Sequence, residues 1–278
     1  MKYIEVSFII KPYLQENEDL LIAILSENQY DSFWQTENEL KAYIEENLFS
    51  IENLQSICNS LQNIFTVETT INSLPEKNWN EEWEKSYPFT IISERCLIRA
   101  PFHKDTPKTE FEIIIEPKMS FGTGHHSTTS LMVELILNME IANKNILDMG
   151  CGTGILAIIS SLKNAKKITA IDFDEWAYEN SIENSKKNKC TNIEIIKGTA
   201  AEIPHESYDI ILANINRNVL LEDIGTYFKH LNQNSNLVIS GFLQSDIEII
   251  WKKAEEFKLL PIKVVTKNNW VAAIFEKS

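Results

Sequence analysis

Residues 146–156 read ILDMGCGTGIL, in which an apolar strand ends at a glycine-rich turn that opens a helix. In an open α/β sheet, ligands bind outside the carboxyl ends of the strands, and glycine lets the backbone approach a ligand closely. Gly150, Gly152 and Gly154 follow the spacing G-x-G-x-G. A dinucleotide-binding turn has G-x-G-x-x-G and aims a helix at a pyrophosphate, so the spacing observed favours a nucleoside ligand without phosphate.

The sequence around this turn alternates between strand and helix patterns as far as residue 278. Such alternation predicts a Rossmann-like α/β domain over residues 89–278, with an open, mostly parallel sheet and helices on both faces. Only residues 267–269 separate the last two strands, which is too short for a parallel crossover, so we expect the last strand to be antiparallel. The seven expected strands are Asn145–Met149, Lys167–Asp172, Ile193–Lys197, Asp209–Ala213, Leu237–Ser240, Pro261–Thr266 and Trp270–Phe275.

Residues 1–74 show a different pattern, with the order β-α-β-β-α-β. This order predicts a small ferredoxin-like α+β domain, a fold that hosts many functions. In the segment that follows, Trp79, Trp83 and Tyr87 recur every four residues and would form one aromatic face of a helix. We therefore expect a linker helix over residues 75–88 and place the domain boundary there.

The charge of the chain is strongly acidic. Among 278 residues, 26 Lys and Arg stand against 40 Asp and Glu, which gives a net charge of -14. This balance argues against a protein that holds nucleic acid by neutralising its phosphates. Residues 1–78 alone carry 13 acidic and 4 basic side chains. That excess fits either a cationic partner or a surface that only maintains solubility.

Targeting and redox signals are absent from the sequence. No run is long and apolar enough for a membrane span, and the N-terminus becomes charged too early for a secretory signal. The four cysteines, Cys58, Cys96, Cys151 and Cys190, lie far apart and form no disulfide or metal-binding pattern. These features predict a cytoplasmic protein that has no membrane partner.

Polar residues follow the strands that lie nearest to the glycine turn. Asp172 stands 22 residues beyond Gly150, where a carboxylate accepts the hydroxyls of a ribose. A helix N-cap is the alternative role for Asp172, although Asp174 is better placed for it. Asn214 ends the fourth strand, and it either holds an amine whose lone pair faces an electrophile or only caps the next helix. Asp148 is expected to tie down the turn.

Residues 116–129 read EPKMSFGTGHHSTT, a polar loop that we expect to cover the cleft. The adjacent His125 and His126 would diverge by about 100° on a helix and have no partner at ligand spacing, which disfavours a metal site. The chain has no G-x-S-x-G elbow, and Cys151 needs no explanation beyond its small side chain. A nucleophilic serine or cysteine is therefore poorly supported.

Together these motifs resemble the bacterial ribosomal protein L11 methyltransferases, which use S-adenosylmethionine. The resemblance covers nearly the whole chain and rests on NWNEEW at 78–83, FGTGHHSTT at 121–129, LDMGCGTGILA at 147–157, Asp172, ANI at 213–215 and SGFL at 240–243. It implies a class I methyltransferase domain in which Thr129, Gly150, Gly152, Asp172 and Asn214 contact S-adenosylmethionine. Asn214 is also the expected catalytic residue, because it would orient the amine.

The resemblance further implies which substrate is modified. Methyl groups would be transferred to lysine side chains and the N-terminal α-amine of ribosomal protein L11, free or on the ribosome, with neither a metal nor specificity for nucleic acid. The domain of residues 1–74 would recognise that protein. Family members often have proline where Ser127 stands here, and the match of the N-terminal domain is one of architecture only.

Two alternatives to this function remain open at the level of sequence. One is a methyltransferase for another amine, either a metabolite or a different protein. The other is a non-catalytic ribosome-assembly module that keeps the cofactor fold. A nicotinamide-dependent dehydrogenase is disfavoured because its third glycine would stand one residue later.

Overall fold

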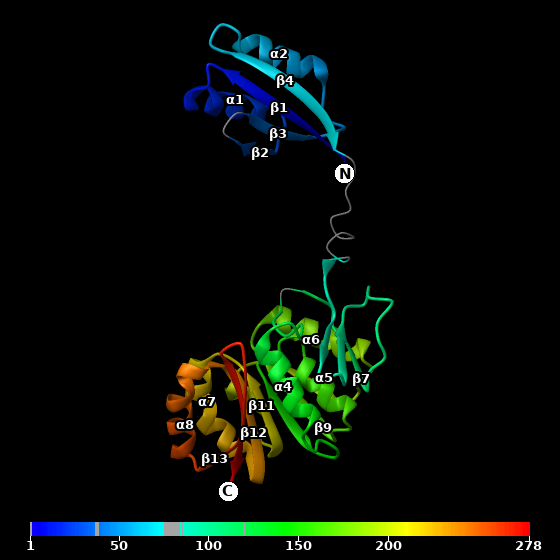
Figure 1. Cartoon of the computed structure of the whole chain (residues 1–278), viewed down its shortest axis with the longest axis vertical. Coiled ribbons are helices and arrows are strands. Elements are labelled where there is room, and N and C mark those ends of the chain that lie inside the picture. Colours follow the sequence, from blue (N-terminus) through cyan, green and yellow to red (C-terminus); the bar gives the residue numbers. More distant parts are fainter. Residues whose placement is uncertain (1, 37–38, 75–83, 85, 119) are drawn as a thin grey trace. The chain divides into compact units, whose positions relative to one another are not determined.

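The computed structural model describes residues 2–36, 39–74, 84, 86–118 and 120–278. The chain forms two compact units, Met1–Ser86 and Tyr87–Ser278 (Figure 1), and each is described by itself. The expected linker helix over residues 75–88 falls mostly outside the described residues.

The N-terminal unit is built on one antiparallel sheet with the strand order β2-β3-β1-β4. This order and the sequence of elements confirm the ferredoxin-like prediction. The elements are β1 (Tyr3–Lys11), α1 (Gln15–Glu27), β2 (Ser32–Gln35), β3 (Leu40–Glu45), α2 (Ile51–Leu61) and β4 (Thr66–Leu74).

Side-chain alternation along the central strand explains how this unit packs. Successive residues of a strand point to opposite faces, and every second residue of β1 from Ile4 to Ile10 is buried. Both helices cover that face, with Leu21 of α1 and Leu54 of α2 in the same core. Ser50 starts α2 because its side chain accepts a hydrogen bond from the Asn53 amide at 3.2 Å.

The C-terminal unit contains a seven-stranded sheet with the order β10-β9-β8-β11-β12-β14-β13. Strand β14 is antiparallel to both of its neighbours, β12 and β13, whereas β10, β9, β8, β11 and β12 pair with one another in parallel, as expected. The elements of the sheet and its helices are α4 (Ser127–Leu137), β8 (Asn145–Met149), α5 (Ile155–Leu162), β9 (Lys167–Asp172), α6 (Glu175–Lys187), β10 (Ile193–Lys197), η1 (Ala200–Glu202), β11 (Tyr208–Asn214), α7 (Arg217–His230), β12 (Leu231–Leu243), η2 (Gln244–Asp246), α8 (Ile247–Glu256), β13 (Leu259–Lys267) and β14 (Trp270–Lys277).

Helices cover both faces of this sheet. The side of α4 and α5 and the side of α7 and α8 each carry a separate hydrophobic core (Figure 1). Neighbouring residues of β8 divide between them, since Ile146 lies in the first core and Leu147 in the second. A strand buried on both faces in this way reads as a continuous apolar run, which is why it is recognisable from sequence. No helix in the described part of the chain is long and apolar enough to cross a membrane.

The strand order places the glycine turn at a reversal of the sheet. From β8 the chain proceeds outward through β9 and β10, then returns to the other side of β8 as β11. The connections that follow β8 and β11 therefore leave the sheet in opposite directions. At such a switch point a crevice opens outside the carboxyl ends of the strands.

A small three-stranded sheet lies beside the main one and contains β5 (Thr90–Ile92), β6 (Cys96–Arg99) and β7 (Phe111–Ile114). Two asparagines, one within α6 and one at its C-cap, form hydrogen bonds to the backbone at and just beyond β7. Asn188 accepts from the Ile114 amide at 2.8 Å and donates to the Ile114 carbonyl at 2.7 Å. Asn184, fully buried, accepts from the Glu116 amide at 2.8 Å and donates to the Thr153 carbonyl at 2.9 Å. Asn184 thus connects the start of the 116–126 loop to the glycine turn.

Replacing Asn184 with leucine tests this connection. The variant leaves the Glu116 amide and the Thr153 carbonyl without their partner, and buried polar groups without partners are costly. We expect the free energy of unfolding to fall by about 2–4 kcal/mol. Urea titration followed by circular dichroism measures it, with Glu179→Gln on the exposed side of the same helix as the control. Equal midpoints for the wild type and Asn184→Leu would contradict the assignment.

Candidate active site

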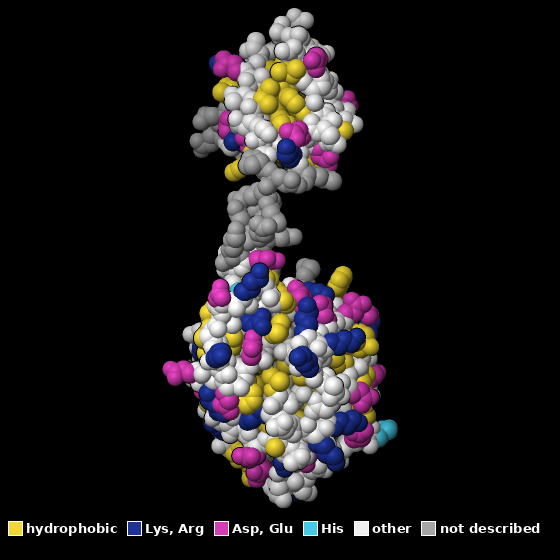
Figure 2. All heavy atoms as spheres, turned by 90° about the vertical axis from the view of Figure 1, so that its right-hand side faces the viewer, with side chains coloured by type: hydrophobic (Ala, Val, Ile, Leu, Met, Phe, Trp, Pro, Cys, Tyr) yellow, Lys and Arg dark blue, Asp and Glu magenta, His cyan; other side chains and the backbone are white. Residues whose placement is uncertain are grey.

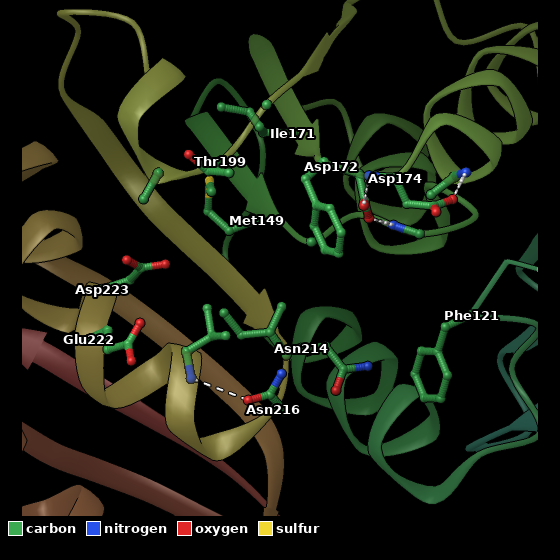
Figure 3. Close-up of a pocket in the computed structure, with 18 of the residues that line it drawn as sticks. Phe121, Met149, Ile171, Asp172, Asp174, Thr199, Asn214, Asn216, Glu222 and Asp223 are labelled. Atoms are coloured by element: carbon green, nitrogen blue, oxygen red, sulfur yellow. Dashed lines mark hydrogen bonds between the residues drawn. The ribbon is translucent and has the colours of Figure 1, made fainter.

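A cavity of about 980 Å³ lies at the carboxyl edge of the main sheet. The turns and loops that follow β8, β9, β10 and β11 form its walls, and one side of α7 closes it (Figure 3). Gly150, Gly152, Asp172 and Asn214 all line this cavity. Thr129 does not line it; the structure buries this residue completely in α4, next to Asn214.

The glycine turn passes between two other segments with no room for side chains. Gly150 and Gly152 have φ angles of +65° and +56°, a region that side chains disfavour. A Cβ atom on Gly150 would lie 2.3 Å from Cγ2 of Ile215, and one on Gly152 would lie 2.3 Å from the carbonyl oxygen of Phe121. Glycine at both positions therefore lets the turn lie against the loops that carry Phe121 and Ile215.

Asp172 joins the glycine turn to the loop after β9. Its Oδ2 accepts a hydrogen bond from the Gly152 amide at 2.8 Å, and its Oδ1 accepts one from the Asp174 amide at 3.1 Å. The helix N-cap is Asp174, which accepts from the Ala177 amide at 2.9 Å. A carboxylate has about four acceptor positions, so each oxygen of Asp172 keeps one for a ligand.

Asp148 is buried beneath the same turn. Its Oδ2 accepts from the Ala157 amide at 3.0 Å in the first turns of α5, as a residue that ties down the turn should. Its Oδ1 is buried and has no hydrogen-bond partner among the residues described. Burial, and secondarily the negative charge of Asp172, raise the pKa of Asp148 to about 7.

Asn214 is placed at the end of β11, on the wall of the cavity (Figure 3). Its Nδ2 donates to Oγ1 of Thr129 at 3.5 Å. Its Oδ1 is buried, and the described part of the chain offers it no partner. The helix N-cap is again a different residue, Asn216, whose side chain accepts from the Val219 amide at 3.2 Å. An amide oxygen in this position is free to accept a hydrogen bond from a bound ligand.

Several lining residues were not predicted from the sequence. Phe173 and Trp176 follow Asp172 and are 72% and 67% exposed beside the cavity. Gly198 and Thr199 line it after β10, and a glycine directly beyond a strand was the signal for them in the sequence. Phe121, 53% exposed, adds a further aromatic ring from the loop before α4.

The charged groups of the cavity are all of one sign. Its described lining contains Asp172, Asp174, Glu222 and Asp223 and no lysine or arginine. Glu222 and Asp223 project from α7 (Figure 3). Burial raises the pKa of Asp223, although the Tyr227 hydroxyl, which donates to it at 3.2 Å, opposes this shift. An anionic, partly aromatic cavity favours a ligand that carries positive charge.

His125, His126 and Cys151, the residues that could suggest a metal site or a nucleophile, have structural roles. His126 caps α4 by accepting from the Thr128 amide at 3.3 Å, and a ring nitrogen of His125 lies 3.0 Å from the Pro88 carbonyl. Burial raises the pKa of the Cys151 thiol, which therefore stays protonated. Among the described residues, no group of three or more His, Cys, Asp and Glu side chains is arranged to hold a metal ion.

Comparison with known proteins places these features in one family. The profile of the family described as ribosomal protein L11 methyltransferase matches residues 8–278. A ribosomal protein L11 methyltransferase of Phocaeicola vulgatus is 42% identical over 279 residues, which is 99% of each chain. One from Chlorobaculum tepidum is 35% identical over 282 residues, 99% of this chain and 96% of the other. The crystal structure of a ribosomal protein L11 methylase from Lactobacillus delbrueckii subsp. bulgaricus superposes with a TM-score of 0.65 and 24% identity, covering 69% of this chain and 100% of that one.

The pKa of Asp148 predicts how stability depends on pH. A carboxyl whose pKa is raised to about 7 in the folded protein holds its proton more tightly there than in the unfolded chain, where the pKa is about 3.9. Stability is therefore lost as the pH rises between these values. Relative to Asp148→Asn, we expect the wild-type free energy of unfolding to fall by up to about 1.4 kcal/mol per pH unit between about pH 5 and 7.

Urea titrations of both proteins across this pH range measure the effect. Asp105→Asn, which removes an exposed carboxylate, is the control and should follow the wild type. Parallel pH profiles for the wild type and Asp148→Asn would show that Asp148 does not titrate with a raised pKa.

Proposed function

The chain belongs to the ribosomal protein L11 methyltransferase family, and from this premise we propose that it transfers methyl groups from S-adenosylmethionine to amines of ribosomal protein L11. The observation that carries the proposal is the buried Oδ1 of Asn214, which has no partner among the described residues, on the wall of an anionic cavity. An acceptor in that place suits a substrate that brings an N–H group, and the charges suit a donor that carries a cationic centre.

The residues present fit S-adenosylmethionine. Gly150 and Gly152 form a turn without side chains at the cavity wall, and Asp172 keeps free acceptor positions for ribose hydroxyls. Phe173 offers an exposed aromatic ring directly after Asp172, suited to an adenine ring. When bound, S-adenosylmethionine supplies an electrophilic methyl group, which forms a bond to the amine nitrogen as the carbon–sulfur bond breaks and its electron pair stays on sulfur.

The amine must be neutral to react, and the protein environment favours that form. A lysine with its reference pKa near 10.4 is almost entirely protonated at pH 7. The apolar side chains of Ile215, half-buried, and Met149, buried, line the same cavity as Asn214, and desolvation by such groups lowers the pKa of an amine. Asn214 Oδ1 then accepts one N–H of the amine and directs its lone pair, so that rate enhancement comes mainly from positioning.

We propose that the domain of residues 1–74, within the N-terminal unit, recognises ribosomal protein L11. Its support is charge: residues 1–78 carry 13 acidic and 4 basic side chains. Figure 2 shows many Lys and Arg side chains on the C-terminal unit and few on the N-terminal unit. A basic partner is attracted to such a surface. The proposed acceptors are lysine side chains and the N-terminal α-amine, on free L11 or on the ribosome, in the cytoplasm.

Intact-mass spectrometry of ribosomal protein L11 tests the activity. After incubation with the enzyme and S-adenosylmethionine, we expect mass gains in steps of about 14 Da. Asp172→Asn should abolish them at cofactor concentrations that saturate the wild type, because one acceptor oxygen is lost. Glu175→Gln, which removes a neighbouring carboxylate outside the cavity, is the control. Tight cofactor binding without any mass gain would contradict the proposed substrate and indicate that the enzyme methylates another amine.

Alanine at Asn214 tests the role of that side chain in the reaction. Because Asn214 acts on the amine, we expect kcat to fall by about 10- to 100-fold, while the Kd for S-adenosylmethionine changes by less than about threefold. Isothermal titration calorimetry gives the Kd, and initial methylation rates give kcat. Asn218→Ala, an exposed position four residues along the chain, is the matched control. Unchanged turnover in Asn214→Ala would remove Asn214 from the mechanism.

A further inference from the structure

Thr129 stands apart from the other residues that the family resemblance connects with the cofactor. It is completely buried and does not line the cavity that Gly150, Gly152, Asp172 and Asn214 share. Within the described chain its side chain makes one hydrogen bond, in which Nδ2 of Asn214 donates to Thr129 Oγ1 at 3.5 Å. The two residues lie 85 positions apart in the sequence.

In the structure this contact is made by the donor end of the Asn214 amide, which leaves the acceptor end for the substrate. An asparagine side chain has an acceptor end and a donor end of nearly equal shape, and rotation by half a turn exchanges them. Only the oxygen can accept an N–H from an incoming amine. With Nδ2 directed to Thr129, Oδ1 is left buried and without a partner in the described residues. That oxygen therefore keeps its acceptor positions for an N–H group of a bound ligand.

The start of α4 is itself fixed by contacts that lie outside the cavity. His126 caps the helix. The last residue of β13 and the turn that follows it reach the same region. Asn268 Nδ2 donates to Ser127 Oγ at 3.1 Å, and Lys267 Nζ donates to Ser130 Oγ at 3.1 Å. Thr129 lies between these two serines in the sequence, so the helix turn that carries it is held in place by the β13–β14 hairpin. Thr129 can therefore serve as a fixed reference point for a side chain on another element.

We propose that Thr129 is a positioning residue, which binds Nδ2 of Asn214 so that Oδ1 faces the amine of the substrate. This assignment rests on the proposed amine methylation and deepens it. Thr129 then affects how the amine nucleophile is oriented and not the affinity for S-adenosylmethionine.

Three variants and a double variant test the proposal kinetically. Thr129→Val keeps the shape and removes the hydroxyl, so we expect kcat to fall by about tenfold or more with little change in the Kd for S-adenosylmethionine. Thr129→Ser should restore wild-type kcat. Thr128→Val removes an equally buried hydroxyl from the same turn, one that bonds His126, and controls for damage to the helix.

The double variant separates positioning from a merely structural effect. If Thr129 acts through Asn214, adding Thr129→Val to Asn214→Ala should cause no further loss of kcat, because the side chain that it orients is already gone. Additive losses would overturn the proposal. So would a rise in the Kd for S-adenosylmethionine as large as the fall in kcat, since Thr129 would then act on the cofactor.

A spectroscopic measurement tests the contact between Thr129 and Asn214 independently of enzyme activity. The side-chain amide signal of Asn214 in an NMR spectrum of the ¹⁵N-labelled full chain is identified by its absence in Asn214→Ala. It should shift in Thr129→Val and stay in place in Thr128→Val and Thr129→Ser. An unmoved signal in Thr129→Val would overturn the proposal even if the enzyme is active. Conversely, a shifted signal in a protein that fails to methylate ribosomal protein L11 would reject the proposed function and leave the contact established.

Discussion

The close approach of the glycine turn to two neighbouring loops is the constraint on which the site depends. The glycine turn after β8 lies against Phe121 on one side and Ile215 on the other, at distances that exclude a Cβ atom. This approach brings the loop before α4 and the end of β11 to the same cavity. Asp172 also stabilises the turn, because it accepts a hydrogen bond from the Gly152 amide. Residues distant in sequence can therefore act on one ligand.

The negative charge that suits the cavity for a cationic ligand also has a cost within the fold. Asp148 is buried under the turn with one oxygen unpaired in the described chain, and the nearby charge of Asp172 adds to the effect of burial on its pKa. A positively charged ligand close to Asp172 would offset part of that repulsion. Binding and the stability of the turn are therefore linked through the same two carboxylates.

Sequence predicted the parts of the fold that local patterns encode. Strands such as β8 and β9 are buried on both faces and appear as apolar runs, and glycines with positive φ mark the turn. Strand β12 begins at Leu231, whereas the prediction began at Leu237, because residues 232–236 read NQNSN and lack an apolar pattern. Glu222 and Asp223 were not found either. Their place on the cavity wall depends on which side of α7 faces the sheet edge, a tertiary property.

The pair Thr129 and Asn214 shows the same limit at the level of chemistry. Both residues belong to the family motifs, but the motifs do not reveal that Asn214 lines the cavity whereas Thr129 is buried beside it and bonds to Asn214. Their contact requires α4 to be held in place, and the hairpin of β13 and β14 supplies that support through Ser127 and Ser130. The antiparallel end of the sheet thus serves the site as well as the fold. It fixes the helix that orients the amide at the end of β11.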